Sequence, residues 1–181
     1  MWTYLWCHIV YHLTRWFPKH SRQGIQLTLI LFSCALLVPQ IIVILRDESQ
    51  RHCERALLYY SIAGACITMV MIGFTLVLAV MEPLAWQVKL AFHVYGGGCF
   101  IFGLLQFAEV LQASSCKSTI PALYYLSMVF ASFSAFAAVI FTILVPFWVF
   151  NRLFRHAVLD RKERKGLCYE PVACCSCVWH V

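Results

Sequence analysis

The chain has 181 residues, of which 62% are hydrophobic and only 12% are charged, and its formal net charge is +6. Soluble domains carry roughly 25% charged residues, so this composition excludes a water-soluble globular protein. Four long apolar stretches use most of the chain and leave no room for a separate soluble enzyme domain. We therefore expect a single all-α domain that is integral to a membrane.

Residues 1–23 predict an amphipathic helix that lies in the membrane interface. Apolar residues recur here at helical spacing, with polar and basic residues between them. Trp and Tyr prefer the level of the lipid headgroups, because their rings are apolar and their tips are polar. A disordered aromatic tail is the alternative interpretation. The apolar stripe consists of Trp2, Trp6, Ile9, Leu13 and Trp16, and Pro18 closes the segment.

Residues 24–150 predict a bundle of four transmembrane helices. About 20 apolar residues in a helix cross the ~30 Å hydrocarbon core, and only helices satisfy the backbone at this segment length. The first span lacks the features of a cleaved signal peptide, so we expect it to act as an uncleaved signal anchor. The four apolar stretches are Gly24–Leu45, Ala56–Met81, Leu90–Gln112 and Ile120–Phe150.

Small residues within these spans predict the helix faces that pack together, since close approach drives helix association in lipid. Gly96 and Gly103 are seven residues apart and therefore share one face of the third span. Pro39 in the first span and Pro146 in the fourth each remove a backbone hydrogen bond, so we expect kinks there. The other small residues at suitable spacing are Ser61, Gly64, Ala65, Thr68, Ser127, Ala131, Ser134, Ala135 and Ala138.

The distribution of Lys and Arg predicts that both termini face the cytosol, where positive residues near span ends remain. Ten of the fourteen lie in the N-terminal segment, the loop of residues 82–89 and the tail of residues 151–181. Only Arg46, Arg51, Arg55 and Lys117 lie in the other two loops.

Two cysteines lie in the loops assigned to the non-cytosolic side, Cys53 in one and Cys116 in the other. Disulfides form in oxidising compartments, so we predict a bridge between them. Two unrelated thiols are the alternative, because the opposite topology places both in a reducing compartment.

The third span contains three polar residues close together, Gln106, Glu109 and Gln112. An ionisable group within a span indicates function unless it is paired or solvated. These three residues predict a site for a proton or cation. A helix end that already touches water is the structural alternative.

Residues 151–181 form a basic tail with four cysteines. The basic residues attract the tail to anionic lipids and bring the thiols to the membrane surface, which favours S-palmitoylation. Zinc binding is the alternative, although the spacing lacks two separated C-x-x-C pairs. Trp179 and Val181 also fit an apolar ligand for a PDZ-type domain. The expected lipidation sites are Cys174, Cys175 and Cys177, and then Cys168.

Motifs of hydrolases, P-loop enzymes and zinc peptidases are absent from the sequence. Gly96–Gly98 is not a phosphate-binding loop, because it lies within an apolar helix without a preceding strand. We therefore expect a non-enzymatic protein with no catalytic residue, no cofactor and no bound metal.

The string H-V-Y-G-G-G-C-F-I-F-G-L-L-Q-F, which runs from residue 93 to residue 107, resembles the damage-regulated autophagy modulator family of membrane proteins. The resemblance covers about sixty residues with the span before it, and His93, Val94, Gly96 and Gly103 are the matching positions. It implies a multi-pass protein of lysosomal or related membranes that modulates autophagy or lipid handling without known catalysis. That family usually has six spans, whereas four are predicted here.

Together these patterns predict a four-span scaffold or modulator that acts in membrane trafficking or autophagy. Its expected partners are membrane lipids, other membrane proteins and a PDZ-type domain, with no nucleic acid. Its expected location is the plasma membrane or an endosomal or lysosomal membrane. The alternative function is a small channel or transporter subunit in which Glu109 lies on an ion or proton path.

Overall fold

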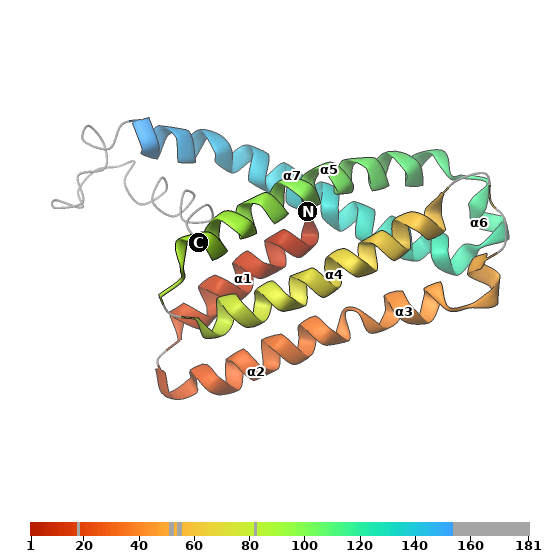
Figure 1. Cartoon of the computed structure of the whole chain (residues 1–181). Helices are drawn as coiled ribbons and strands as arrows, with labels where there is room; N and C mark the ends of the chain where they lie inside the picture. The colour runs from red at the N-terminus through yellow and green to blue at the C-terminus, as the bar shows by residue number, and fades with distance from the viewer. Residues whose placement is uncertain (18, 51–52, 54–55, 82, 154–181) are drawn as a thin grey trace. The chain divides into compact units, whose positions relative to one another are not determined.

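The structure is a computed structural model that describes residues 1–17, 19–50, 53, 56–81 and 83–153 (Figure 1). These residues contain helices and no strand, as the sequence predicts. The chain forms two compact units, Met1–Ala137 and Ala138–Val181, and the helix packing below is that of the first. The α-helices are α1 Trp2–Trp16, α2 Lys19–Ala35, α3 Val38–Ile44, α4 Leu57–Val80, α5 Trp86–Gln112, α6 Cys116–Thr119 and α7 Pro121–Leu153, with a 3-10 helix, η1, at Asp47–Gln50.

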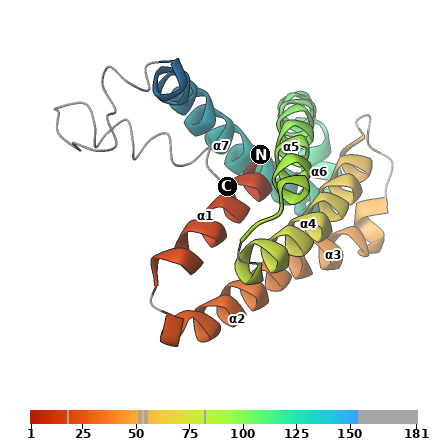
Figure 2. The same ribbon diagram turned by 60° about the vertical axis from the view of Figure 1, so that its left-hand side comes forward.

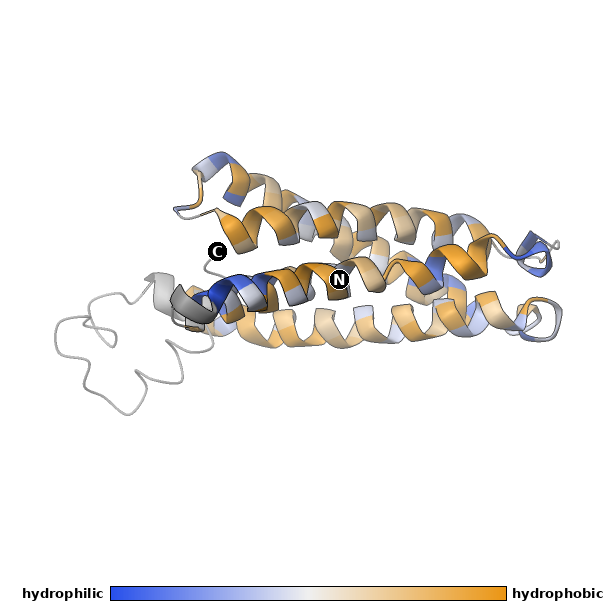
Figure 3. Cartoon of the chain, turned by 90° about the horizontal axis from the view of Figure 1, so that it is seen from below, coloured by the Kyte–Doolittle hydropathy of each residue, from blue (hydrophilic) through white to orange (hydrophobic). Residues whose placement is uncertain are grey.

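Four helical segments are long and apolar enough to cross a membrane, which confirms the predicted spans to within a few residues. Large apolar side chains remain exposed on them, as lipid contact requires. Figure 3 shows hydrophobic residues along the middle of the helices and hydrophilic residues mainly near their ends. The protein is therefore a multi-pass membrane protein. The segments are Arg22–Ile44, Leu57–Val80, Trp86–Gln112 and Pro121–Phe147.

The first span is interrupted, because α2 ends at Ala35 and α3 begins at Val38. Pro39 lies in the first turn of α3, where its missing N–H costs least. Gln40 follows it, and the Gln40 Nε2 donates to the Leu36 carbonyl in the break at 3.1 Å. The kink expected at Pro39 is thus a two-residue break with a polar side chain beside it.

The predicted N-terminal helix exists as α1, and it packs against other helices of the first unit. The Met1 nitrogen donates to the carbonyl oxygen of Cys99, the middle residue of α5, at 3.0 Å. Figures 1 and 2 both show α1 beside α4, with the N-terminus part-way along the bundle. An amphipathic stripe shows that one face of a helix is stable in an apolar environment. Here neighbouring helices of the same chain provide that environment. The buried residues of α1, together with Met1 directly before it, are Met1, Thr3, Tyr4, Cys7, His8, Val10 and Thr14.

The other end of the first unit is joined by a disulfide between Cys53 and Cys116, whose Cα atoms are 5.7 Å apart. This confirms the predicted bridge between the two loops. Cys116 also belongs to a buried apolar cluster that links the start of α4, the end of α5 and the start of α7. The cluster consists of Leu57, Val110, Ala113, Cys116, Ile120, Leu123, Tyr124 and Ala131.

The second unit continues α7 through Pro146 to Leu153. The Thr142 hydroxyl donates to the Ala138 carbonyl at 2.8 Å, one turn before the proline.

The disulfide predicts that the bundle loses stability when both cysteines are replaced. Replacing Cys53 and Cys116 together by Ser removes a constraint on a 63-residue separation. The chain-entropy model rates such a constraint at about 4 kcal/mol, so we expect a marked fall in the melting temperature. Thermal unfolding in lipid nanodiscs measures this, with Cys66→Ala as the control at an exposed free cysteine. Equal melting temperatures for the double variant and the control would contradict the prediction.

Candidate functional site: a polar pocket at the start of the N-terminal helix

Two glycines on α5 allow α1 to approach closely. A Cβ atom added to Gly96 would lie 2.5 Å from the Tyr4 ring, and one added to Gly103 would lie 3.3 Å from the Met1 nitrogen and from the Ser134 Cβ. The glycine face predicted from the seven-residue spacing is therefore real, and α1 and α7 cover it. Small residues serve here to bring backbones together, as they do between spans in lipid.

Aromatic residues of α1 pack against protein, not against lipid headgroups alone. The Tyr4 ring stacks on Phe92 with centroids 4.6 Å apart, and its hydroxyl lies 3.1 Å from the His93 Nδ1. The Trp2 ring stacks on Phe130 of α7 at 5.1 Å. These contacts orient the first turn of α1 between α5 and α7.

Polar side chains from α1 and α2 satisfy the last carbonyl groups of α4. The Arg15 guanidinium donates to the carbonyls of Leu78 at 3.0 Å and Met81 at 3.2 Å. The Gln26 Nε2 donates to the Ala79 carbonyl at 2.6 Å. The C-terminal carbonyls of a helix have no partner within the helix, so these donors stabilise the end of α4 and position α1 along it.

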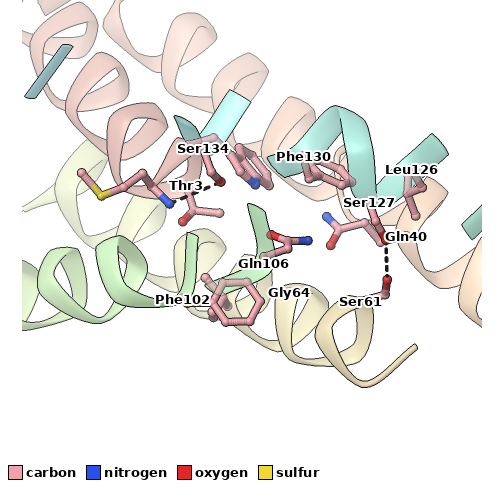
Figure 4. A pocket seen from close by; sticks show the side chains of 13 residues that line it. Thr3, Gln40, Ser61, Gly64, Phe102, Gln106, Leu126, Ser127, Phe130 and Ser134 are labelled. Carbon is pink, nitrogen blue, oxygen red and sulfur yellow. Dashed lines mark hydrogen bonds between the residues drawn. The ribbon is translucent and has the colours of Figure 1, made fainter. Parts of the chain in front are cut away.

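A small polar pocket lies where α1 begins, inside the first unit (Figure 4). Its volume is about 20 Å³. Helices α3, α4, α5 and α7 supply the rest of its wall, with amide and hydroxyl groups on one part and aromatic rings on another. The lining residues whose positions Figure 4 labels are Thr3, Gln40, Ser61, Gly64, Phe102, Gln106, Leu126, Ser127, Phe130 and Ser134.

Most polar groups around the pocket are bonded across helices. The Ser61 and Ser127 hydroxyl oxygens lie 3.1 Å apart, which joins α4 to α7. The Gln40 Nε2 donates to the Thr68 hydroxyl at 3.0 Å, and Thr68 donates to the Gly64 carbonyl at 2.9 Å. The predicted small-residue seams of the second and fourth spans therefore carry hydrogen bonds as well as close contacts.

The three polar residues of the third span occupy different environments. Gln106 is buried and lines the pocket, Glu109 is half-buried, and Gln112 is exposed at the last position of α5. The structure brings Gln106 together with Gln40, which the sequence interpretation did not name, and with Ser61 and Ser127, which it named only as packing residues. A polar residue directly after a proline inside an apolar span was the signal for Gln40.

The predicted lipidation and peptide-motif residues lie outside the residues that the structure describes. These are Cys168, Cys174, Cys175, Cys177, Trp179 and Val181. Within the described part of the chain, no three His, Cys, Asp or Glu side chains gather as a metal site requires.

A comparison of this chain with protein families, with curated proteins and with solved structures finds no match. The resemblance to damage-regulated autophagy modulators therefore stays a prediction from the sequence. The site has to be interpreted from its own geometry.

The glycine contact predicts that one methyl group at residue 96 disturbs α1. In Gly96→Ala, the new Cβ overlaps the Tyr4 ring, and we expect a loss of about 1–3 kcal/mol from overpacking. The matched control is Gly97→Ala, where no other group lies within 4 Å and where Ala favours the helix by roughly 0.5–1 kcal/mol. Thermal unfolding in nanodiscs compares the two variants. The contact would be refuted if Gly96→Ala were as stable as Gly97→Ala.

Proposed function

We propose that this protein is a non-enzymatic membrane scaffold or modulator whose partners are membrane lipids and other membrane proteins. The supporting observation is that the interior of the bundle is already filled by parts of this chain. The chain's own helix α1 occupies it, and its polar groups bond neighbouring helices to one another. In the part of the chain that the structure describes, the apolar outer face of the spans is open to contact.

The outer face of α7 supports lipid or protein contact. Phe133 and Phe136 are 59% and 62% exposed, and they border a shallow, almost wholly apolar groove. Apolar surface of this kind is favourable against lipid chains and against the side chains of another membrane helix.

The charge distribution supports a cytosolic position for both termini, and the family resemblance supports a role in trafficking or autophagy at endosomal or lysosomal membranes. Arg15, beside the last turn of α4, and Lys89, in the first turn of α5, lie at the end of the first unit away from the Cys53–Cys116 bridge. The Cys53–Cys116 bridge at the opposite end fits an oxidising compartment on that side. The basic, acylated tail would then lie along the cytosolic leaflet.

The alternative is a channel or transporter subunit that uses Glu109. Its support is an ionisable residue within a spanning helix. The pocket next to Gln106 has only about 20 Å³, which is too small for a hydrated ion. We therefore favour the scaffold.

Reconstitution in liposomes separates the two functions. We expect proton and cation flux equal to that of protein-free liposomes, and no change in Glu109→Gln, because the polar groups of the interior serve packing. Flux that Glu109→Gln abolishes, and that the control Glu48→Gln on the exposed 3-10 helix leaves unchanged, would replace the scaffold by the transporter.

The proposed tail modification has its own test. Replacing Cys174, Cys175 and Cys177 by Ser should abolish hydroxylamine-sensitive acyl exchange and shift the protein among cellular membranes. The four spans still anchor the protein, so the bundle should stay folded. Cys34→Ser, at an exposed cysteine of α2, is the control. Zinc binding would replace acylation if the unmodified protein gave no exchange signal and retained zinc that a chelator removes.

A further inference from the structure

We propose that the polar pocket at the start of α1 is a binding site for a single water molecule, which the Gln106 amide holds. The bonding of Gln106, the chemistry of the pocket wall and the size of the cavity all point to this ligand. It is independent of the scaffold function.

Gln106 is only 4% exposed, and its side chain makes no hydrogen bond to any residue that the structure describes. Its amide has one carbonyl acceptor and two N–H donors. Figure 4 shows the side chain among the pocket residues, with the amide facing the cavity. Lipid offers no hydrogen bonds at this depth, so an amide here needs a partner inside the protein.

Gln40, the other buried side-chain amide at the pocket, has hydrogen-bond partners within the protein. Its Nε2 has two acceptors within 3.1 Å, the Leu36 carbonyl and the Thr68 hydroxyl. Gln106 has the same side chain and the same 4% exposure. Both amides line the pocket, but only Gln40 has side-chain hydrogen bonds to residues that the structure describes, so we assign the occupant of the cavity as the partner of Gln106.

The wall offers further hydrogen bonds to the same occupant. The Ser61–Ser127 bond uses one of two hydroxyl protons, so one proton and several lone pairs remain. The side chains that line the pocket are uncharged, and the one ionisable group at its wall, the Met1 amino group, already donates to the Cys99 carbonyl at 3.0 Å and to the Ser134 hydroxyl at 3.5 Å. A neutral molecule that both donates and accepts hydrogen bonds fits this wall.

The volume restricts that molecule to water. A buried water molecule needs a cavity volume of roughly 10–15 Å³ and typically makes about three hydrogen bonds. The pocket provides about 20 Å³. This accommodates one water molecule, and the aromatic rings of Phe102 and Phe130 close the wall where no hydrogen bond is available.

Water-selective NMR of the full chain in lipid nanodiscs tests the site, with deuterated protein labelled with ¹⁵N in the Gln side chains. We expect a cross-peak between the Gln106 NH₂ protons and water, with the NOE sign of a water bound for longer than nanoseconds. Gln106→Leu, or Gln106→Glu if the first variant does not fold, assigns the signal by removing it. The exposed Gln112 is the control and should show only the fast exchange of surface water.

Two outcomes would overturn the proposal. One is a Gln106 NH₂ signal without any water cross-peak in a sample where Gln112 exchanges normally. The other is a cross-peak to lipid or detergent protons in place of water, which would identify a different occupant.

Discussion

The packing of α1 against the glycine face of α5 is the constraint on which the rest of the first unit depends. Gly96 and Gly103 leave room for the Tyr4 ring and the Met1 nitrogen, so α1 lies inside the bundle and not on its surface. At 1.5 Å per residue, the 15 residues of α1 are only about 22 Å long, less than the ~30 Å hydrocarbon core. The helix therefore occupies one end of the bundle, and its first residues reach the middle.

This placement explains why the interior is polar at mid-span. A helix that begins inside the bundle brings unpaired backbone donors with it, and the break before α3 brings unpaired carbonyls. Hydroxyl and amide groups must supply the missing bonds, because lipid cannot. Gln40 at the break and Ser134 near the Met1 nitrogen are examples. Gln40 and Ser134 are thus explained by helix ends, without requiring an ion path.

Some of this architecture follows from the sequence and some does not. The spans are predictable because about 20 apolar residues have few alternatives to crossing a membrane. The bridge is predictable because Cys53 and Cys116 are isolated in two loops. The position of α1 is not, since periodicity defines an apolar face without saying whether lipid or protein covers it. The grouping of Gln106 with Gln112 failed for a geometric reason: six residues rotate a helix by about 600°, so the two side chains face different directions.

The most direct test of the docked helix is disulfide cross-linking between α1 and α5. The Thr3 hydroxyl lies 3.3 Å from the Cys99 sulfur, so Thr3→Cys places a thiol beside the native one. We expect mild oxidation in native membranes to yield a linked peptide pair detectable by mass spectrometry, while Ile9→Cys, at a position of α1 that is 39% exposed, gives none. If Thr3→Cys does not link to Cys99 and instead reacts with a membrane-impermeant maleimide, α1 lies at the membrane interface and is not docked on α5.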